Sequence, residues 1–174
     1  MTLGSPSQAD AVARNGSSVQ TRLSFPFGWP AGGDSLIGAR TDLPSPYDSG
    51  KSTLIGGDGS DLLVGGDPCN GDSFSGGPGS DTASFVRFNP GVTAEIGGAV
   101  TRAGGDCTAG SIDGSVEALE GSAGNDTLIG NDLANTISAR GGNDTLVGRG
   151  GDDRLVGGSG GGRLIGGAGR DSQH

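Results

Sequence analysis

Acidic and amide side chains recur every nine residues near the C-terminal end of this 174-residue chain. The series runs Asp126, Asn135, Asp144, Asp153 and Asp171, and Gly162 stands in the one place where it is broken. Carboxylate and amide oxygens are the ligands that a hard divalent cation prefers, and a fixed period places equivalent oxygens on equivalent turns. The spacing therefore predicts rows of cation-binding oxygens.

An aliphatic residue follows each of the first five places of this series, Gly162 included, by two positions. These residues are Leu128, Ile137, Leu146, Leu155 and Leu164, and Leu63 stands in the same relation to Asp61. Because successive side chains of a strand point to opposite faces, each aliphatic residue predicts the middle of a short strand with that side chain facing an interior. Turn and strand recur together, so the segment is predicted to be a repeat protein with a thin apolar core.

Glycine recurs at the first, second and fourth places of the nine-residue unit. The clearest unit, residues 56–64, reads GGDGSDLLV. Glycine permits positive φ and close approach of neighbouring turns, and such turns direct carbonyl oxygens inward. The glycines assigned to the predicted cation sites are Gly56, Gly57, Gly59, Gly124, Gly142 and Gly151.

The unit resembles the glycine-rich nonapeptide of the RTX, or haemolysin-type calcium-binding, family, which reads G-G-x-G-x-D-x-U-x with U a large apolar residue. The resemblance covers residues 56–85 and 121–171 and depends on a register held over consecutive copies. It implies an all-β fold, a parallel β-roll in which two nonapeptides form one coil. It also implies that Ca2+ binds between turns that stack on the same side, about 18 residues apart.

Carried over to this chain, the resemblance pairs Asp126 with Asp144 and stacks Asn135 on Asp153 and Asp171. Asp61 pairs with Asp81 across 20 residues, because two extra residues fall in the stretch before Asp72. The implied side-chain ligands for Ca2+ are Asp61, Asp72, Asp81, Asp126, Asn135, Asp144, Asp153 and Asp171. Gly162 removes a ligand opposite Asp144, so we expect that site to be weak or empty.

Folding of the repeats is expected to depend on the cation. Carboxylates on adjacent turns would lie about 4.8 Å apart at sheet spacing, which costs roughly 3 to 4 kcal/mol per pair at an effective dielectric of about 20. With 39 glycines and only 4% aromatic residues, little apolar burial opposes this repulsion. We expect the repeats to be largely disordered without calcium and binding to supply the folding free energy.

The composition excludes several classes of protein. The net charge is −9, which argues against nucleic acid as a partner. Seventeen of the 20 acidic residues are Asp, and the three glutamates are Glu95, Glu117 and Glu120, so helix-forming runs are absent. No stretch approaches the 18 apolar residues that a membrane span needs.

The pattern divides the chain into five segments. Residues 1–20 are predicted to be a disordered lead, 21–55 degenerate repeats or a cap, 56–85 a first repeat block, 86–120 an insert rung and 121–174 a second repeat block. One roll is predicted to continue through residues 50–174. Phe25, Phe27 and Trp29 are the candidate cap, and Asp34 and Ser52 stand in the acidic place of degenerate copies.

The insert rung breaks the nine-residue period. Alternating apolar residues predict a strand at 92–96, followed by a turn at Gly97 and Gly98. Residues 103–114 are expected to form a bulge that projects outward. Cys69 and Cys107 both lie in inserted segments, and we favour a disulfide between them over two unpaired surface thiols.

Catalytic motifs lack their parts. Residues 49–53 imitate the end of a phosphate-binding loop, but Ser45 stands where the first glycine is required. The one histidine, His174, is the last residue, which leaves no histidine-based triad or histidine-rich zinc site. Paired carboxylates resemble the acid and base of a glycosidase, yet their regular period favours structural metal ligation. We predict no enzymatic activity.

The favoured hypothesis is a calcium-binding RTX module of a secreted bacterial protein, folded by the millimolar calcium found outside cells. The N-terminus has no apolar signal core, and the resemblance implies export through type I secretion. Because the sequence stops within a repeat, we expect a fragment whose exposed coil ends are surfaces for self-association. The alternatives are a C-terminal appendage of an extracellular protease, lipase or epimerase whose catalytic domain is absent, and an adhesion or surface-layer module.

Overall fold

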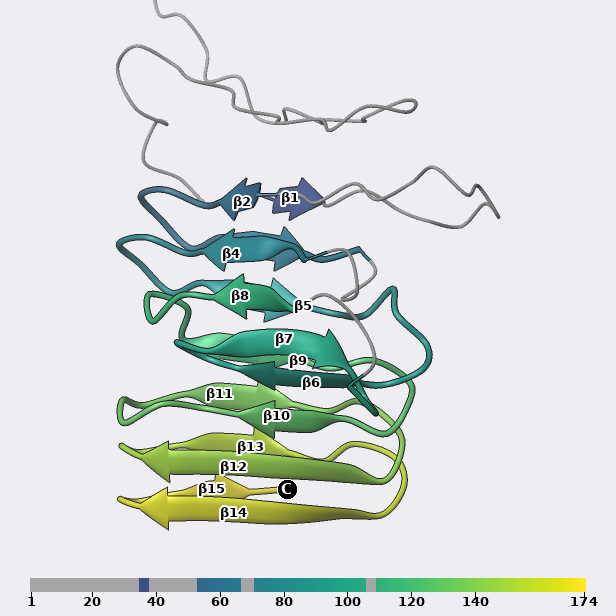
Figure 1. Cartoon of the computed structure of the whole chain (residues 1–174). Coiled ribbons are helices and arrows are strands. Elements are labelled where there is room, and N and C mark those ends of the chain that lie inside the picture. The colour runs from purple at the N-terminus through teal and green to yellow at the C-terminus, as the bar shows by residue number, and fades with distance from the viewer. Residues whose placement is uncertain (1–34, 38–52, 67–70, 106–108) are drawn as a thin grey trace, which may run out of the picture.

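The chain winds into a solenoid of stacked coils with one short strand on each side of every regular coil (Figure 1). The computed structural model describes residues 35–37, 53–66, 71–105 and 109–174. One sheet has the order β1 (Ser35–Ile37), β3 (Leu62–Val64), β5 (Thr82–Ser84), β9 (Ala118–Glu120), β11 (Thr136–Ser138), β13 (Arg154–Val156) and β15 (Ser172–Gln173). The other has the order β14 (Gly162–Ala168), β12 (Asp144–Gly150), β10 (Thr127–Ile129), β6 (Val92–Glu95), β7 (Ala99–Arg102), β8 (Gly110–Ile112), β4 (Ser73–Ser75) and β2 (Thr53–Ile55).

The nine-residue period sets the register of both sheets. Leu128 pairs with Leu146 and Leu146 with Leu164, each 18 residues on, and Ile137 pairs with Leu155 in the opposite sheet. The middle residue of each regular strand points inward, as the spacing predicts. Leu63, Leu128, Ile137, Leu146 and Leu155 are fully buried. The predicted all-β parallel roll is confirmed.

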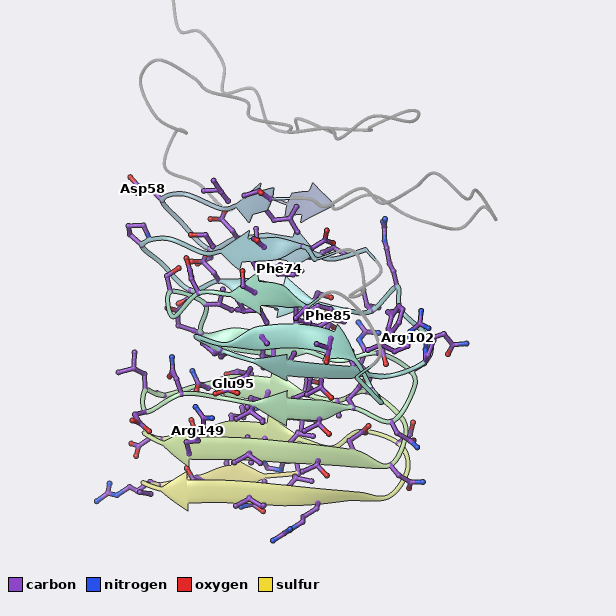
Figure 2. All side chains as sticks on the ribbon, in the orientation of Figure 1. Asp58, Phe74, Phe85, Glu95, Arg102 and Arg149 are labelled. Carbon is purple, nitrogen blue, oxygen red and sulfur yellow. The ribbon has the colours of Figure 1, made fainter. Side chains whose placement is uncertain are left out.

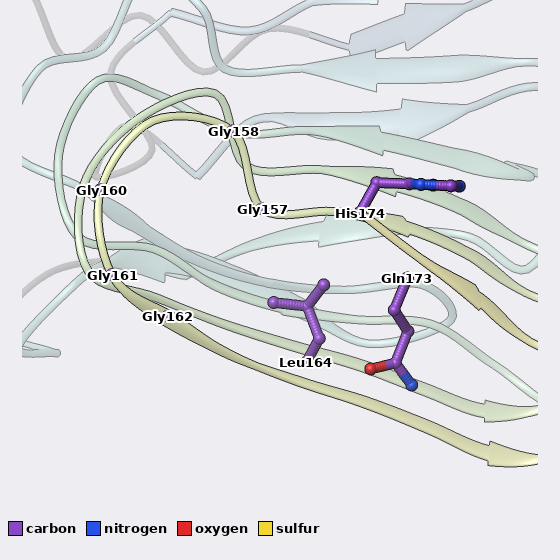
Figure 3. Close-up of a pocket in the computed structure, with 8 residues that line it drawn as sticks. All are labelled: Gly157, Gly158, Gly160, Gly161, Gly162, Leu164, Gln173 and His174. Carbon is purple, nitrogen blue, oxygen red and sulfur yellow. The ribbon is translucent and has the colours of Figure 1, made fainter.

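The last coil of the described residues is the exception in the core. Leu164 is only partly buried and lies at an open hollow with Gln173 and His174, while the rest of the lining is glycine (Figure 3). The backbone there is still paired, since the N–H of Gly157 donates to the carbonyl oxygen of His174 at 2.8 Å.

The insert rung departs from the parallel arrangement. The predicted strand is β6, but β6 pairs antiparallel with β7, and β7 pairs antiparallel with β8. Only residues 96–98 separate β6 from β7, which is a hairpin turn and too short for a parallel crossover. Gly97, with φ of 77°, provides the reversal. The expectation that residues 103–114 project outward is wrong for Gly110–Ile112, which form β8 within the sheet and bury Ile112.

The largest core side chains lie where the insert widens the solenoid. Phe74 and Phe85 meet edge to face with ring centroids 5.5 Å apart, and both are buried (Figure 2). The guanidinium of Arg102 lies 5.7 Å from the ring centroid of Phe88. These rings supply more apolar volume than the two inward aliphatic side chains of a regular coil.

Several predictions fall on residues outside the described ranges. These are the lead at 1–20, the aromatic cap of Phe25, Phe27 and Trp29, the degenerate acidic places Asp34 and Ser52, and the disulfide between Cys69 and Cys107. The strand of the first degenerate repeat is described, since β1 pairs in parallel with β3. Nowhere in the described ranges does a helix have the length and apolarity to cross a bilayer.

Candidate metal centre

The acids of the repeats lie at the turns that lead into the strands. Asp61, Asp81, Asp126, Asn135, Asp153 and Asp171 each precede a strand directly, and Asp144 begins one. All but Asp171 are buried, with at most 3% of their surface exposed, and so is Asp72. Each of these residues therefore stands where a glycine-rich turn passes into a strand.

Backbone amides connect these acids from one coil to the next. The N–H of Asp126 donates to Oδ1 of Asp144 at 2.8 Å, and the N–H of Asn135 donates to Oδ1 of Asp153 at 2.8 Å. Asp153 donates likewise to Asp171 at 3.0 Å, and Asp61 to Asp81 at 2.8 Å. The structure thus brings together each pair and stack expected from the sequence. We call this arrangement the acid ladder.

Three members of the acid ladder have an oxygen that nothing satisfies. Oδ2 of Asp81, Asp144 and Asp153 is buried and has no hydrogen-bond partner among the described residues. An unpaired buried carboxylate oxygen is costly, so such an atom indicates a missing positive partner. We call these residues the three orphaned aspartates.

Burial raises the pKa of all three orphaned aspartates above the ordinary value of 3.8. The backbone N–H that each one accepts offsets part of this effect. Neighbouring carboxylates add to the rise in pKa: Glu117 for Asp81, Asp126 for Asp144 and Asp171 for Asp153. A bound cation would reverse both causes, because it replaces lost solvation and neutralises the neighbours.

Carbonyl oxygens converge on the same places. A Cβ built on Gly148 would lie 2.0 Å from Oδ2 of Asp153 and 2.5 Å from the carbonyl oxygen of Gly166. The equivalent atom on Gly56 would lie 2.2 Å from Oδ2 of Asp61 and 2.6 Å from the carbonyl oxygen of Gly76. The space beside the first glycine is therefore an all-oxygen cradle open only because the side chain is absent. Its donor set fits Ca2+.

The other glycines assigned from the sequence present their carbonyl oxygens to the next coil. The oxygens of Gly57, Gly59, Gly124, Gly142 and Gly151 would each lie within 2.3 Å of a Cβ added to the glycine stacked on them. A side chain would therefore collide with backbone at the stacked positions. Glycine at these places therefore allows the close stacking of adjacent coils.

Two predicted sites lack a second acid. Asp144 pairs with Gly162, as the sequence indicates. Asp72 lies beside β8, where the register places Gly110 opposite it. No group of three or more His, Cys, Asp or Glu side chains that could hold a metal ion occurs in the described ranges.

The sequence reasoning missed Glu117. Its Oε2 accepts the N–H of Asp81 at 2.8 Å, which is the bond that an aspartate makes elsewhere in the acid ladder. The insert breaks the nine-residue period, so counting does not reach this residue. The available signal was local, namely an acid directly before the Ala118–Glu120 strand.

Two arginines occupy the second place of a repeat, where the pattern has glycine. Arg140 and Arg149 have φ of 77° and 80°. Arg140 forms an ion pair with Glu120, and Arg149 forms one with Glu95. Exposed pairs of this kind contribute about 0 to 1 kcal/mol, comparable to the strain of a left-handed non-glycine residue.

Comparison with known proteins agrees with the geometry. The family model described as the RTX calcium-binding nonapeptide repeat (4 copies) matches residues 48–67, 113–132 and 129–164. A search of curated proteins finds no match. The matched residues include Asp61, Asp126, Asn135, Asp144 and Asp153, each of which lies next to or within a strand of the two sheets. The solenoid is therefore a parallel β-roll whose repeats match the RTX calcium-binding nonapeptide model over residues 48–67 and 113–164.

Proposed function

We propose that this chain is a non-catalytic module of a secreted protein whose β-roll folds when it binds Ca2+. The observation that carries the proposal is the set of three orphaned aspartates. Each has a buried carboxylate oxygen with no hydrogen-bond partner among the described residues. Two of them also donate their own N–H to a carboxylate on the adjacent coil, Asp81 to Glu117 and Asp153 to Asp171. A cation between coils satisfies these atoms and cancels the repulsion.

The proposed ions bind between stacked pairs: Asp61 with Asp81, Asp126 with Asp144, Asn135 with Asp153, and Asp153 with Asp171. The carboxylates supply negative charge, and the glycine turns supply carbonyl oxygens. When bound, Ca2+ contributes a positive charge shared by two coils. The pair that contains Asn135 has one carboxylate, so we expect it to bind more weakly than the pair of Asp153 and Asp171.

An extracellular location follows from the same reasoning. Calcium sites of sensor-grade or weaker affinity are filled by millimolar extracellular calcium and stay mostly empty at submicromolar cytosolic levels. The module would then remain unfolded inside the cell and fold after export. Its role would be to help the protein that carries it fold and persist outside.

Far-ultraviolet circular dichroism during a calcium titration tests the proposal. We expect a disordered spectrum in chelator, a cooperative gain of β signal with Ca2+, and no comparable gain with Mg2+, which demands a smaller octahedral site. A β spectrum that is fully formed in chelator and unchanged by Ca2+ would refute the folding switch.

A further inference from the structure

The acid ladder continues where the nine-residue period fails. In the seven-stranded sheet, β5 of the first repeat block lies directly against β9 of the insert. Asp81 precedes β5 and Glu117 precedes β9, which gives the two residues the same relation as a stacked pair of the repeats. The N–H of Glu117 and that of Ala118 both donate to the carbonyl oxygen of Asp81, at 3.2 and 2.9 Å.

Asp81 points to an absent partner at this junction. Its side chain is completely buried, and its Oδ1 accepts the N–H of Asp61 at 2.8 Å. Its Oδ2 has no hydrogen-bond partner among the described residues. This oxygen faces the space beside Gly76, where a Cβ would lie 2.4 Å from it. A buried carboxylate oxygen left open in this way is what the regular sites also show.

The insert supplies the other oxygens by a shorter turn. The carbonyl oxygen of Ser115 lies 2.7 Å from the same Cβ position on Gly76 and so takes the place that Gly166 has beside Gly148. In the regular coil, the acid Asp171 stands five positions after the glycine that supplies the carbonyl oxygen, Gly166. In the insert, Glu117 stands only two positions after Ser115. The additional methylene of glutamate spans part of this difference, and Oε2 reaches the N–H of Asp81.

Hydrogen bonds hold the Ser115 turn in place. Its N–H donates to Oδ1 of Asp113 at 3.0 Å, its hydroxyl donates to the same oxygen, and its Oγ accepts the N–H of Gly77 at 2.9 Å. The carbonyl oxygen of Ser115 is therefore fixed towards Gly76, and the carboxylate of Asp113 adds negative charge close to the junction.

We propose that Asp81, Glu117 and the carbonyl oxygen of Ser115 form a further Ca2+ site, which joins the first repeat block to the insert rung. The inference rests on the proposed calcium function, and it adds a ligand that the nonapeptide pattern does not specify. With this site, the row of bound ions would continue into the insert rung and would not end at Asp81.

The test counts bound ions per chain by native mass spectrometry of the full chain at saturating Ca2+. Glu117→Gln keeps a hydrogen-bond acceptor for the N–H of Asp81 and removes the charge, so we expect one ion fewer with the β signal retained. Asp132→Asn removes the same charge from an exposed turn residue and should keep the full count. A full count for E117Q overturns the inference, because Glu117 would then be only a hydrogen-bond acceptor.

A second variant covers the case in which E117Q does not fold. Gly76→Ala places a methyl group into the cradle without changing any charge, and we expect it to lose one ion as well. An unchanged count for G76A overturns the site. If the unmodified chain binds no Ca2+, the proposed function itself fails, whereas a chain that binds Ca2+ with equal counts in E117Q, G76A and D132N refutes only the junction site.

Discussion

Replacing Asp153 by asparagine should change stability in opposite directions with and without calcium. Asp153 stands in the middle of a stack, since it accepts the N–H of Asn135 and donates its own N–H to Asp171. Asparagine keeps the side-chain oxygen that accepts the first of these bonds. The substitution therefore removes a charge and an orphaned carboxylate oxygen but leaves the hydrogen bonding of the ladder in place.

The magnitude without calcium follows from the spacing of the coils. Two carboxylates about 4.8 Å apart repel by roughly 3 kcal/mol at an effective dielectric of about 20. Asp171 is partly exposed, which reduces the repulsion to about 1 to 2 kcal/mol. In chelator, D153N should therefore increase the folding equilibrium constant by about tenfold.

With saturating calcium the sign reverses. Asp153 belongs to two stacked pairs, and the pair with Asn135 would keep no carboxylate. A site filled at 100 times its dissociation constant stabilises by about 2.7 kcal/mol, so weakening two sites should lower the free energy of unfolding by up to about 5 kcal/mol. The ion count should fall by one or two.

Urea unfolding followed by circular dichroism, in chelator and at millimolar Ca2+, measures both effects. Asp152→Asn is the matched control, because Asp152 is the exposed neighbour and loses the same charge. The reasoning is refuted if D153N is no more folded than D152N in chelator, or if both variants respond equally to calcium.

Three further outcomes are expected. In chelator, acidification from pH 7 towards pH 4 should increase the β signal. The raised pKa of the three orphaned aspartates contributes stability that is complete below the unfolded pKa of about 3.8 and is lost as pH rises through the folded pKa values. A β signal that falls on acidification over this range would contradict the prediction. Gly162→Asp should add one bound ion opposite Asp144. Gly162→Ala is the control, because it introduces the same Cβ, 2.9 Å from the carbonyl oxygen of Asp144, and it should add no ion. Equal ion counts for the two variants by native mass spectrometry would refute the pairing. Leu146→Ala should lower the free energy of unfolding in calcium by about 2 to 5 kcal/mol and Leu164→Ala by less, because Leu146 is fully buried and Leu164 only partly; equal losses in urea unfolding would argue against a core that ends at the last coil.

The acid ladder shows which contacts could be predicted from the nine-residue spacing. Asp126 with Asp144 and Asn135 with Asp153 were predictable as stacked pairs because two nine-residue units close one coil, so neighbours in space lie 18 residues apart. The inward leucines follow from the same count and from strand alternation. The metal ligand roles of these residues remain predictions.

The insert rung could not be predicted in the same way. Its strand at Val92–Glu95 was visible in the apolar alternation, but the antiparallel partners of that strand and the place of β8 were not. Strand pairing in the insert depends on which strand lies nearest once the coils are stacked, and the nine-residue period does not specify that strand. Gly110–Ile112 were therefore wrongly expected to be part of a projecting bulge.

The sequence by itself determined the coil, its period, its inward side chains and the acids of the regular sites, because each of these repeats within 9 or 18 residues. Only the tertiary structure decided that Glu117 continues the ladder from Asp81, 36 residues away, and that Arg149 meets Glu95 across 54 residues. These contacts join segments of unequal length whose stacking depends on how the insert folds. The sequence separation of such a contact is not set by the nine-residue repeat, so only the packed structure reveals it.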